Sequence, residues 1–226
     1  MVNFKSLEGE IDFYFVRHGK STGNKKNIIQ GHLDFPLSEE GKLQAKRAGK
    51  WFSDKRIDMI LTSPLSRAKS TAELIAESTG GVEVETEELL KELDTGVFSG
   101  FVFDDIPRTH PEEWASFQEK SWEGVTNAEK PDEIYNRAVE LWNKLFILAS
   151  RGYRSILAVS HAGMIQWIIK ATFGHREWLP LFPMSNGGIF QFSVRNRLPA
   201  RDGKLRGVNN PGTSYMYRWA LINFRP

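Results

Sequence analysis

An arginine and a histidine directly follow the first apolar run of this chain. Residues 13–16 lead into Arg17 and His18, and a short polar turn continues to Asn24. A guanidinium can hold phosphate oxygens with its planar fork, and a neutral imidazole nitrogen can attack phosphorus. The pattern also fits a strand that merely ends in polar residues, so the pair indicates a phosphate site without establishing one.

Three further residues with useful chemistry occur where predicted elements begin or end. Arg67 stands in the first turn of a predicted helix, Glu92 lies in a loop, and His161 follows a late apolar strand. Each has an ordinary alternative as a surface arginine, an exposed loop carboxylate or a buried core histidine. Because the carboxyl ends of parallel strands share one sheet edge, their joint occurrence predicts that they converge with Arg17 and His18.

The elements that must position these residues alternate along the chain. Apolar runs predict strands at residues 11–16, 57–61, 82–84, 155–159, 189–194 and 215–222. Helices are predicted after an N-cap at Ser38, after an N-cap at Ser63 with Pro64 as first helical residue, from Pro131 onward, and over residues 164–172. This order predicts an α/β fold, a three-layer sandwich with a mainly parallel central sheet flanked by helices.

The length of 226 residues fits a single domain, residues 1–226. Two segments depart from the alternation, and we expect them to leave the sheet. One is a cap-like insertion at about 97–130, and the other is a basic C-terminal excursion at about 195–213. The aromatic residues of the insertion either build a small satellite core or face the pocket and favour an apolar or ring-bearing substrate. They include Phe101, Phe103, Trp114 and Phe117.

Composition restricts the possible partners and compartments. The chain has 30 basic and 28 acidic residues, and this net charge of +2 does not favour a nucleic-acid partner. The absence of cysteine excludes disulfides and thiol catalysis and fits a reducing compartment. No signal peptide and no apolar run of membrane-spanning length is present, which predicts a cytoplasmic protein without a membrane partner.

Five motifs between residues 11 and 194 together resemble those of the histidine phosphatase superfamily, also called the phosphoglycerate-mutase-like family. They are Arg17-His18-Gly19 with Ser21 and Asn24; residues 31–41 with Asp34, Pro36 and Leu37; Ser63-Pro64-Leu65-Ser66-Arg67-Ala68 with Thr71-Ala72; Glu92 with Gly96 and Gly100; and Ser160-His161-Ala162-Gly163. Lys20, His32 and Ser99 depart from residues that are frequent in the family. The departures remove no group that the chemistry needs, but Lys20 and Ser99 argue against transferring a substrate from relatives.

The expected activity is metal-independent hydrolysis of a phosphomonoester through a phosphohistidine on His18, as the resemblance also implies. Glu92 would donate the proton to the leaving group, and the positive charge would come from arginine rather than from a metal or cofactor. Five histidines raise a metal site as an alternative, but no His-Glu-x-x-His pair is present. The phosphate-binding residues would be Arg17, Arg67, His161 and Asn24, with Ser21, Thr22 and Gly23 of the turn.

Two other functions remain open at this point. A phosphoglycerate-mutase-type phosphotransferase would need a longer cap than the segment between Glu92 and His161 provides. A non-catalytic relative that binds phosphorylated ligands would be marked by loss of a catalytic group, and none is lost. The expected substrate is a small phosphomonoester, although a phosphoprotein is possible. Lys20 and the arginines from Arg195 onward either recognise a second anionic group or form a solvated face. The sequence does not predict an oligomeric state.

Overall fold

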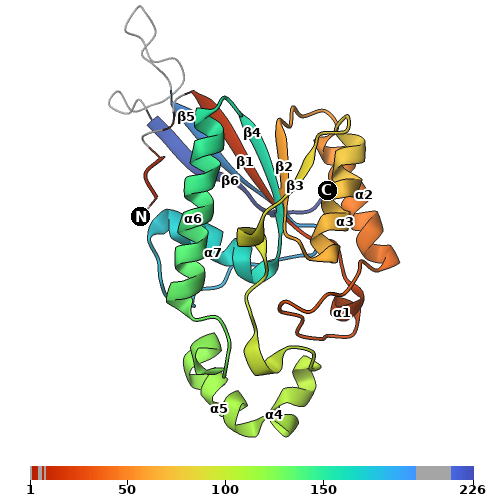
Figure 1. Ribbon diagram of the computed structural model, residues 1–226, viewed down its shortest axis with the longest axis vertical. Coiled ribbons are helices and arrows are strands. Elements are labelled where there is room, and N and C mark those ends of the chain that lie inside the picture. The colour runs from red at the N-terminus through yellow and green to blue at the C-terminus, as the bar shows by residue number, and fades with distance from the viewer. Residues whose placement is uncertain (1, 5–6, 8, 197–214) are drawn as a thin grey trace, which may run out of the picture.

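The computed structural model describes residues 2–4, 7, 9–196 and 215–226. Its centre is a six-stranded sheet with the strand order β3-β2-β4-β1-β5-β6 (Figure 1). The strands are β1 (Glu10–Arg17), β2 (Met59–Thr62), β3 (Val84–Thr86), β4 (Ser155–Ser160), β5 (Ile189–Asn196) and β6 (Tyr215–Phe224). Strands β1 to β4 pair in parallel, whereas β5 and β6 form an antiparallel edge. The prediction of a mainly parallel sheet is therefore confirmed.

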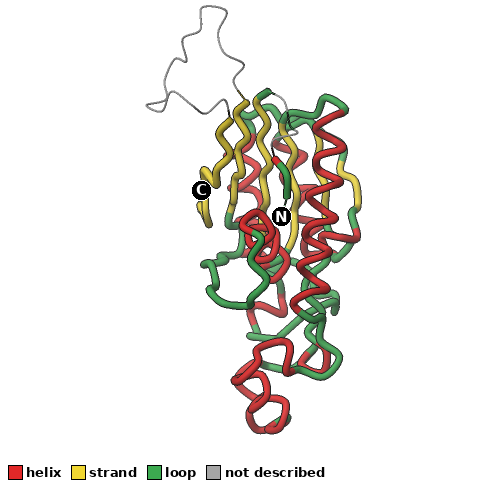
Figure 2. Tube along the Cα trace, turned by 90° about the vertical axis from the view of Figure 1, so that its left-hand side faces the viewer, coloured by secondary structure: helices red, strands yellow, loops and turns green. Residues whose placement is uncertain are grey.

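Helices cover both faces of the sheet, as the second view shows (Figure 2). Helices α2 (Glu39–Phe52) and α3 (Ser66–Ser78) pack on one face, and α6 (Pro131–Ser150) and α7 (Ala162–Phe173) on the other. Strand β1 serves both layers because successive side chains point to opposite faces. Phe13 and Phe15 belong to the core under α6 and α7, and Tyr14 and Val16 to the core under α2 and α3. This arrangement is the predicted three-layer sandwich.

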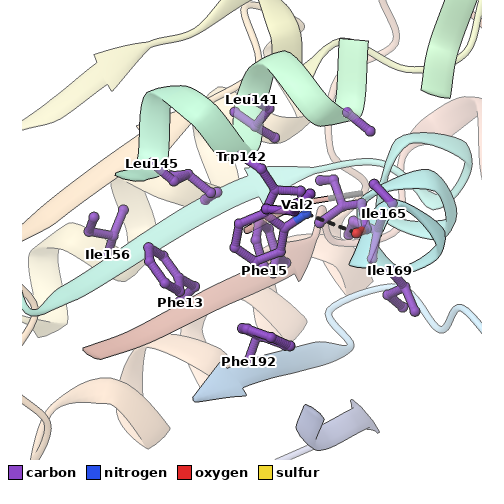
Figure 3. Packing of buried hydrophobic residues seen from close by; sticks show 14 of the residues in the cluster. Val2, Phe13, Phe15, Leu141, Trp142, Leu145, Ile156, Ile165, Ile169 and Phe192 are labelled. Carbon is purple, nitrogen blue, oxygen red and sulfur yellow. Dashed lines mark hydrogen bonds between the residues drawn. The ribbon is translucent and has the colours of Figure 1, made fainter. Parts of the chain in front are cut away.

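Trp142 anchors the larger core. Its ring makes edge contacts with Phe13 and Phe15 at centroid distances of 5.3 and 5.4 Å (Figure 3). Its indole N–H donates to the carbonyl of Ile168 in α7 at 3.0 Å. A fully buried indole needs such a partner, and here the bond also ties α6 to α7. The helix that carries the second histidine at its N-terminus is thus fixed to the sheet and to its neighbour.

One predicted helix start is wrong. Helix α3 begins at Ser66 with Leu65 as its N-cap, rather than after Ser63, and no local side chain caps it. The cap comes from a distant loop, because Asp34 Oδ1 accepts from both the backbone N–H and the hydroxyl of Ser66 at 2.9 and 2.8 Å. Ser63 is left free for another contact, described below. By contrast, Ser38 caps α2 as predicted, accepting from the Gly41 N–H at 3.1 Å.

The segment at 97–130 lies beyond one end of the sheet (Figures 1 and 2). It contains α4 (Ile106–Thr109), α5 (Pro111–Lys120) and the 3₁₀ turns Phe103–Asp105 and Ser121–Gly124. A further short helix, α1 (Thr22–Lys25), lies earlier in the chain, in the turn after His18. Its core is a separate cluster formed by Phe98, Ile106, Val125 and Ala128. Trp114 and Phe117 pack on this cluster, whereas Phe101 and Phe103 are exposed. Of the two interpretations of the aromatic residues, Trp114 and Phe117 therefore follow the first: they belong to a small satellite core.

The predicted excursion at 195–213 falls mostly outside the described residues. Arg195 is described. It pairs with Glu10 at the start of β1, at the opposite end of that strand from Arg17. It forms two bonds of 2.9 Å with the carboxylate of Asp12. Arg195 is therefore engaged in a structural ion pair. Among the described residues, no helix combines the length and apolar character that crossing a bilayer requires.

Candidate active site

A cavity of about 300 Å³ lies at the carboxyl ends of the parallel strands. Its walls include Arg17, His18, Asn24, Arg67 and Glu92. The register explains the convergence, because Arg17 pairs with Ser160 across β1 and β4 and so the next residues, His18 and His161, emerge side by side. Their ring centroids are 5.0 Å apart, and both side chains are buried. The structure thus brings the five predicted residues together: four of them line the cavity, and His161 lies next to His18 without lining it.

Hydrogen bonding fixes the tautomer of His18. Its Nδ1 lies 2.7 Å from the carbonyl oxygen of Gly19. A carbonyl can only accept, so Nδ1 carries the hydrogen and Nε2 keeps its lone pair. Gly19 must be a glycine here, since a Cβ would lie 2.3 Å from the Gly41 carbonyl oxygen at the start of α2. The imidazole could therefore attack an electrophilic phosphorus through Nε2.

The surroundings of His18 also disfavour its protonation. Burial, and then the positive charges of Arg17 and Arg67, lower the pKa of His18 well below the usual 6.5. Burial lowers the pKa of His161 as well, with Arg67 and His18 adding to the effect. A lowered histidine pKa means that the neutral, nucleophilic form predominates at neutral pH and persists into mildly acidic solution.

We expect the imidazole of His18 to stay neutral as the pH falls through 6.5 and to protonate only below it. A ¹⁵N-resolved NMR titration of the ring, assigned by loss of the signal in His18→Ala, measures this directly. The same ring in urea-denatured protein is the control and should titrate near the model-peptide value of about 6.5. A folded-state titration at or above the denatured one would contradict the electrostatic description of this site.

His161 is oriented by Ser63, the residue that does not cap α3. Ser63 Oγ lies 2.8 Å from His161 Nε2 and accepts from the Leu65 N–H at 3.3 Å. Among the described residues, Nε2 is the only acceptor in hydrogen-bond distance of the Ser63 hydroxyl, so we assign the hydroxyl hydrogen to this bond. That assignment places the ring hydrogen of His161 on Nδ1, which is buried and has no partner. His161 is therefore a neutral ring with one free donor.

The two arginines are held by backbone carbonyls and each retains a free donor. Arg67 donates from Nη1 to Leu33 and from Nη2 to Gly31, both at 2.8 Å, and Arg17 donates from Nη1 to Met184. The Nε atoms of both guanidinium groups are buried without a partner. With His161 Nδ1, three unpaired buried donors therefore belong to one cluster. Buried donors are normally satisfied, so this cluster indicates a missing anionic ligand such as a phosphate.

The carboxylate of Glu92 is fixed through one of its oxygens. Oε1 accepts from the backbone N–H groups of Leu93 at 2.8 Å and of Met164, in the first turn of α7, at 3.2 Å. Gly163 permits this close approach, since a Cβ there would lie 2.5 Å from Oε1. The arrangement leaves Oε2 as the oxygen that can carry or accept a proton in the cavity.

Arg137 of α6 holds the loop that presents Glu92, and sequence reasoning missed it. Its guanidinium donates to the carbonyls of Leu89, Lys91 and Glu92 at 3.0, 2.7 and 3.3 Å. It also forms a bidentate pair with Glu129 at 2.9 and 2.6 Å. An arginine in the middle of an amphipathic helix reads as a surface residue in sequence, so no local signal identifies this role.

The turn after His18 contributes one side chain to the cavity. Asn24 lines it, and its Oδ1 accepts from the Ser21 N–H at 3.1 Å and from Asn186 Nδ2 at 3.2 Å. The amide NH₂ of Asn24 is thereby left to face a ligand. Ser21, Thr22 and Gly23, which were also expected to bind phosphate, do not line the cavity. Ser21 instead caps the short helix and orients Asn24.

Two departures from the family pattern have structural explanations. His32 Nε2 donates to the carbonyl of Glu92 at 2.8 Å and so supports the loop that presents Glu92. Lys20 pairs with Glu40 at 2.9 Å and lines a separate hollow that adjoins Arg17. Lys20 is therefore not placed to bind a second anionic group in the main cavity. The described part of the chain contains no group of three or more acidic or histidine side chains suited to a metal ion.

Comparison with known proteins agrees with the resemblance. Phosphoglycerate mutase-like protein 4 of Arabidopsis thaliana is 32% identical over 154 residues, which is 67% of this chain and 66% of that protein. Phosphoserine phosphatase 1 of Hydrogenobacter thermophilus is 32% identical over 149 residues, 62% of this chain and 70% of that protein. The chain thus spans about two thirds of the length of these curated relatives.

Solved structures share the fold. The alpha-ribazole phosphatase from Shigella flexneri superposes with a TM-score of 0.75 at 21% identity and covers 95% of this chain and 97% of its own. At that identity the likeness concerns the fold alone. The family model of the histidine phosphatase superfamily, branch 1, matches residues 13–200. Since that range is most of the chain, this protein belongs to the histidine phosphatase superfamily.

Proposed function

We propose that this protein is a metal-independent phosphomonoester hydrolase in which His18 is the nucleophile and Glu92 the proton donor. The observation that carries the proposal is the cluster of three unpaired buried donors beside the free Nε2 of His18. A phosphate group has terminal oxygens for those donors and a phosphorus for that nitrogen. The two guanidinium groups offset the charge of the phosphate dianion and that of the transition state.

The first half-reaction transfers the phosphoryl group to the protein. His18 Nε2 forms a bond to phosphorus while the bond between phosphorus and the alcohol oxygen breaks. Protonated Glu92 gives its proton to the departing alkoxide, so the free alcohol leaves. The His18 Nδ1–H bond to Gly19 stabilises the positive charge that develops on the ring.

The second half-reaction regenerates the protein. Glu92, now a carboxylate, removes a proton from a water molecule whose oxygen attacks the phosphorus of phosphohistidine. The N–P bond breaks, inorganic phosphate leaves, and Glu92 is protonated again. Each turnover thus consumes one water and yields one alcohol and one phosphate.

Phosphate release is the test of this proposal. The purified protein is incubated with benzyl phosphate and with 3-phosphoglycerate, and inorganic phosphate and isomerisation are measured together. Hydrolysis releases phosphate in proportion to alcohol. Interconversion of phosphoglycerates without phosphate release would instead establish a mutase activity.

The expected partner is a small phosphomonoester, and the expected compartment is the cytoplasm.

Chelation should leave the activity unchanged. In the proposed mechanism two arginines supply the positive charge that a metal ion would otherwise provide, so dialysis against EDTA should not alter kcat or KM. The control is a metal-dependent phosphatase treated in the same way, which should lose activity. Loss of activity that a single divalent cation restores would contradict the metal-independent mechanism.

A further inference from the structure

The cavity has two chemically different parts. One part of its lining is the set of residues expected around the phosphate, Arg17, His18, Asn24, Arg67 and Glu92. The other part consists of apolar side chains from the turn after His18, the loop that carries Glu92, the cap and the segment after α7: Ile28, Ile29, Leu93, Trp122, Trp178 and Leu181. A volume of 300 Å³ equals that of about ten waters at roughly 30 Å³ each, which leaves room for an organic group beside the phosphate.

The cavity offers no cation to a second anionic group. Among the described residues that line it, the only arginines or lysines are Arg17 and Arg67, and both belong to the phosphate cluster. The remaining acidic or basic wall residue apart from His18 is Glu92, which offers no positive charge to a substrate carboxylate. Lys20 lies in the adjoining hollow and is paired with Glu40. Arg47 and Arg225 also line that hollow and not this cavity. Within the cavity, the carboxylate of a phosphoglycerate or of a phosphorylated amino acid would therefore have no cationic partner.

Two tryptophans belong to the apolar wall. Trp122 of the cap and Trp178 meet edge to face, with centroids 6.2 Å apart. Leu181, also on the wall, is 52% exposed, so a large apolar side chain faces water at the mouth. An apolar ligand group would cover it and gain the burial energy of both surfaces.

Helix α7, whose N-cap is His161, holds the wall segment that carries Trp178 and Leu181. Gln166 of α7 makes two bonds with the backbone of Phe182, at 2.7 and 3.0 Å. Lys170, one turn further, donates to the carbonyls of Glu177, at 2.7 Å, and of Trp178. Residues four apart lie on one side of a helix, so the hydrogen bonds of both side chains hold the same segment, residues 177–182. The apolar wall is thus a preformed surface, which suits specific binding.

We propose that the substrates of this site are phosphomonoesters whose alcohol part is apolar or aromatic and carries no carboxylate near the phosphate. This substrate class rests on the proposed hydrolase function, because it assigns the phosphate to His18 and the alcohol to the tryptophan wall. The alcohol packs against Trp122 and Trp178, and its oxygen lies next to Glu92.

Matched substrates test the inference. Benzyl phosphate and 3-phosphoglycerate are both esters of primary alcohols, so their comparison reports on the organic part. We expect kcat/KM for benzyl phosphate to exceed that for 3-phosphoglycerate at least tenfold. Binding is measured separately by calorimetry with benzylphosphonate and 3-phosphonopropanoate, which cannot be hydrolysed. Benzylphosphonate should have an at least tenfold lower Kd.

Variants of the wall identify the residues responsible. Trp178→Ala should lower the ratio of kcat/KM for benzyl phosphate to that for methyl phosphate at least tenfold. Trp114→Ala is the matched control, because Trp114 packs within the cap and does not line the cavity, and it should leave this ratio unchanged. Leu181→Lys, at an exposed position that does not affect the core, should shift the preference at least tenfold toward 3-phosphoglycerate.

The outcomes separate this inference from the proposed function. Phosphate release with a preference for 3-phosphoglycerate, or an unchanged ratio in Trp178→Ala, would refute the apolar substrate class while leaving the hydrolase intact. Absence of phosphate release from every ester would refute the hydrolase. In that case the two phosphonates still decide the chemistry of the pocket, and equal Kd values would refute the apolar wall as a binding surface.

Discussion

Replacement of His18 by alanine should lower kcat by on the order of 10⁴-fold or more and abolish the phosphoenzyme. The substitution removes the nitrogen that attacks phosphorus, and the neighbouring His161 cannot substitute because its Nε2 is bonded to Ser63. Rapid quench into base with radiolabelled benzyl phosphate should trap a phosphoenzyme in the wild type. The label should be lost in acid, as expected for a nitrogen–phosphorus bond.

The matched control is His110→Ala. His110 lies in the cap, where its Nδ1 is 2.9 Å from the Thr109 hydroxyl, and it does not line the cavity. This variant should retain turnover and the phosphoenzyme. Full activity of His18→Ala would remove His18 from the nucleophilic role. A phosphoenzyme that is stable in acid but labile in base would indicate an acyl phosphate on a carboxylate instead.

The layers of the fold were predictable because they depend on local patterns. Apolar runs at 11–16 and 155–159 mark strands buried on both faces, and the residues that follow a parallel strand must emerge at one edge. That topological rule alone places His18 next to His161. The shortest strand, β3 (Val84–Thr86), was predicted two residues early, since three residues, one half-buried and two exposed, carry almost no periodic signal.

The supporting contacts of the site were not predictable, because they join segments far apart in the chain. Ser63 and Pro64 resemble a helix start, yet Ser63 orients His161, which lies 98 residues away. The helix that follows is capped by Asp34, at a separation of 32 residues. Local propensity can indicate that a serine caps something nearby, but it contains no information about a better partner brought in by the tertiary fold.

Helix α7 shows how the missed contacts combine. Its N-cap is His161, its first turn holds Glu92 through the Met164 N–H, and its later turns clamp the tryptophan wall through Gln166 and Lys170. Sequence periodicity predicts only that this helix is buried. The structure adds that this single helix sets the relative positions of His161, which is expected to donate a hydrogen bond to the phosphate, of Glu92 and of the apolar wall.

Glu92→Gln should separate the two proton transfers assigned to this carboxylate. Glutamine keeps an oxygen to accept from Leu93 and Met164 but cannot give a proton to an alkoxide. We expect kcat/KM for benzyl phosphate to fall about 10²- to 10⁴-fold, the usual contribution of general acid catalysis. With 4-nitrophenyl phosphate the fall should be far smaller, because nitrophenolate leaves without a proton.

The second half-reaction supplies an independent measurement in the same variant. Without the carboxylate that activates water, the phosphohistidine formed from 4-nitrophenyl phosphate should accumulate, giving a burst of one nitrophenolate per active site followed by slow turnover. Glu40→Gln is the control, because Glu40 pairs with Lys20 in the adjoining hollow and lines no part of the main cavity. Equal losses of kcat/KM with both esters, without a burst, would show that Glu92 supports the geometry of the site and transfers no proton.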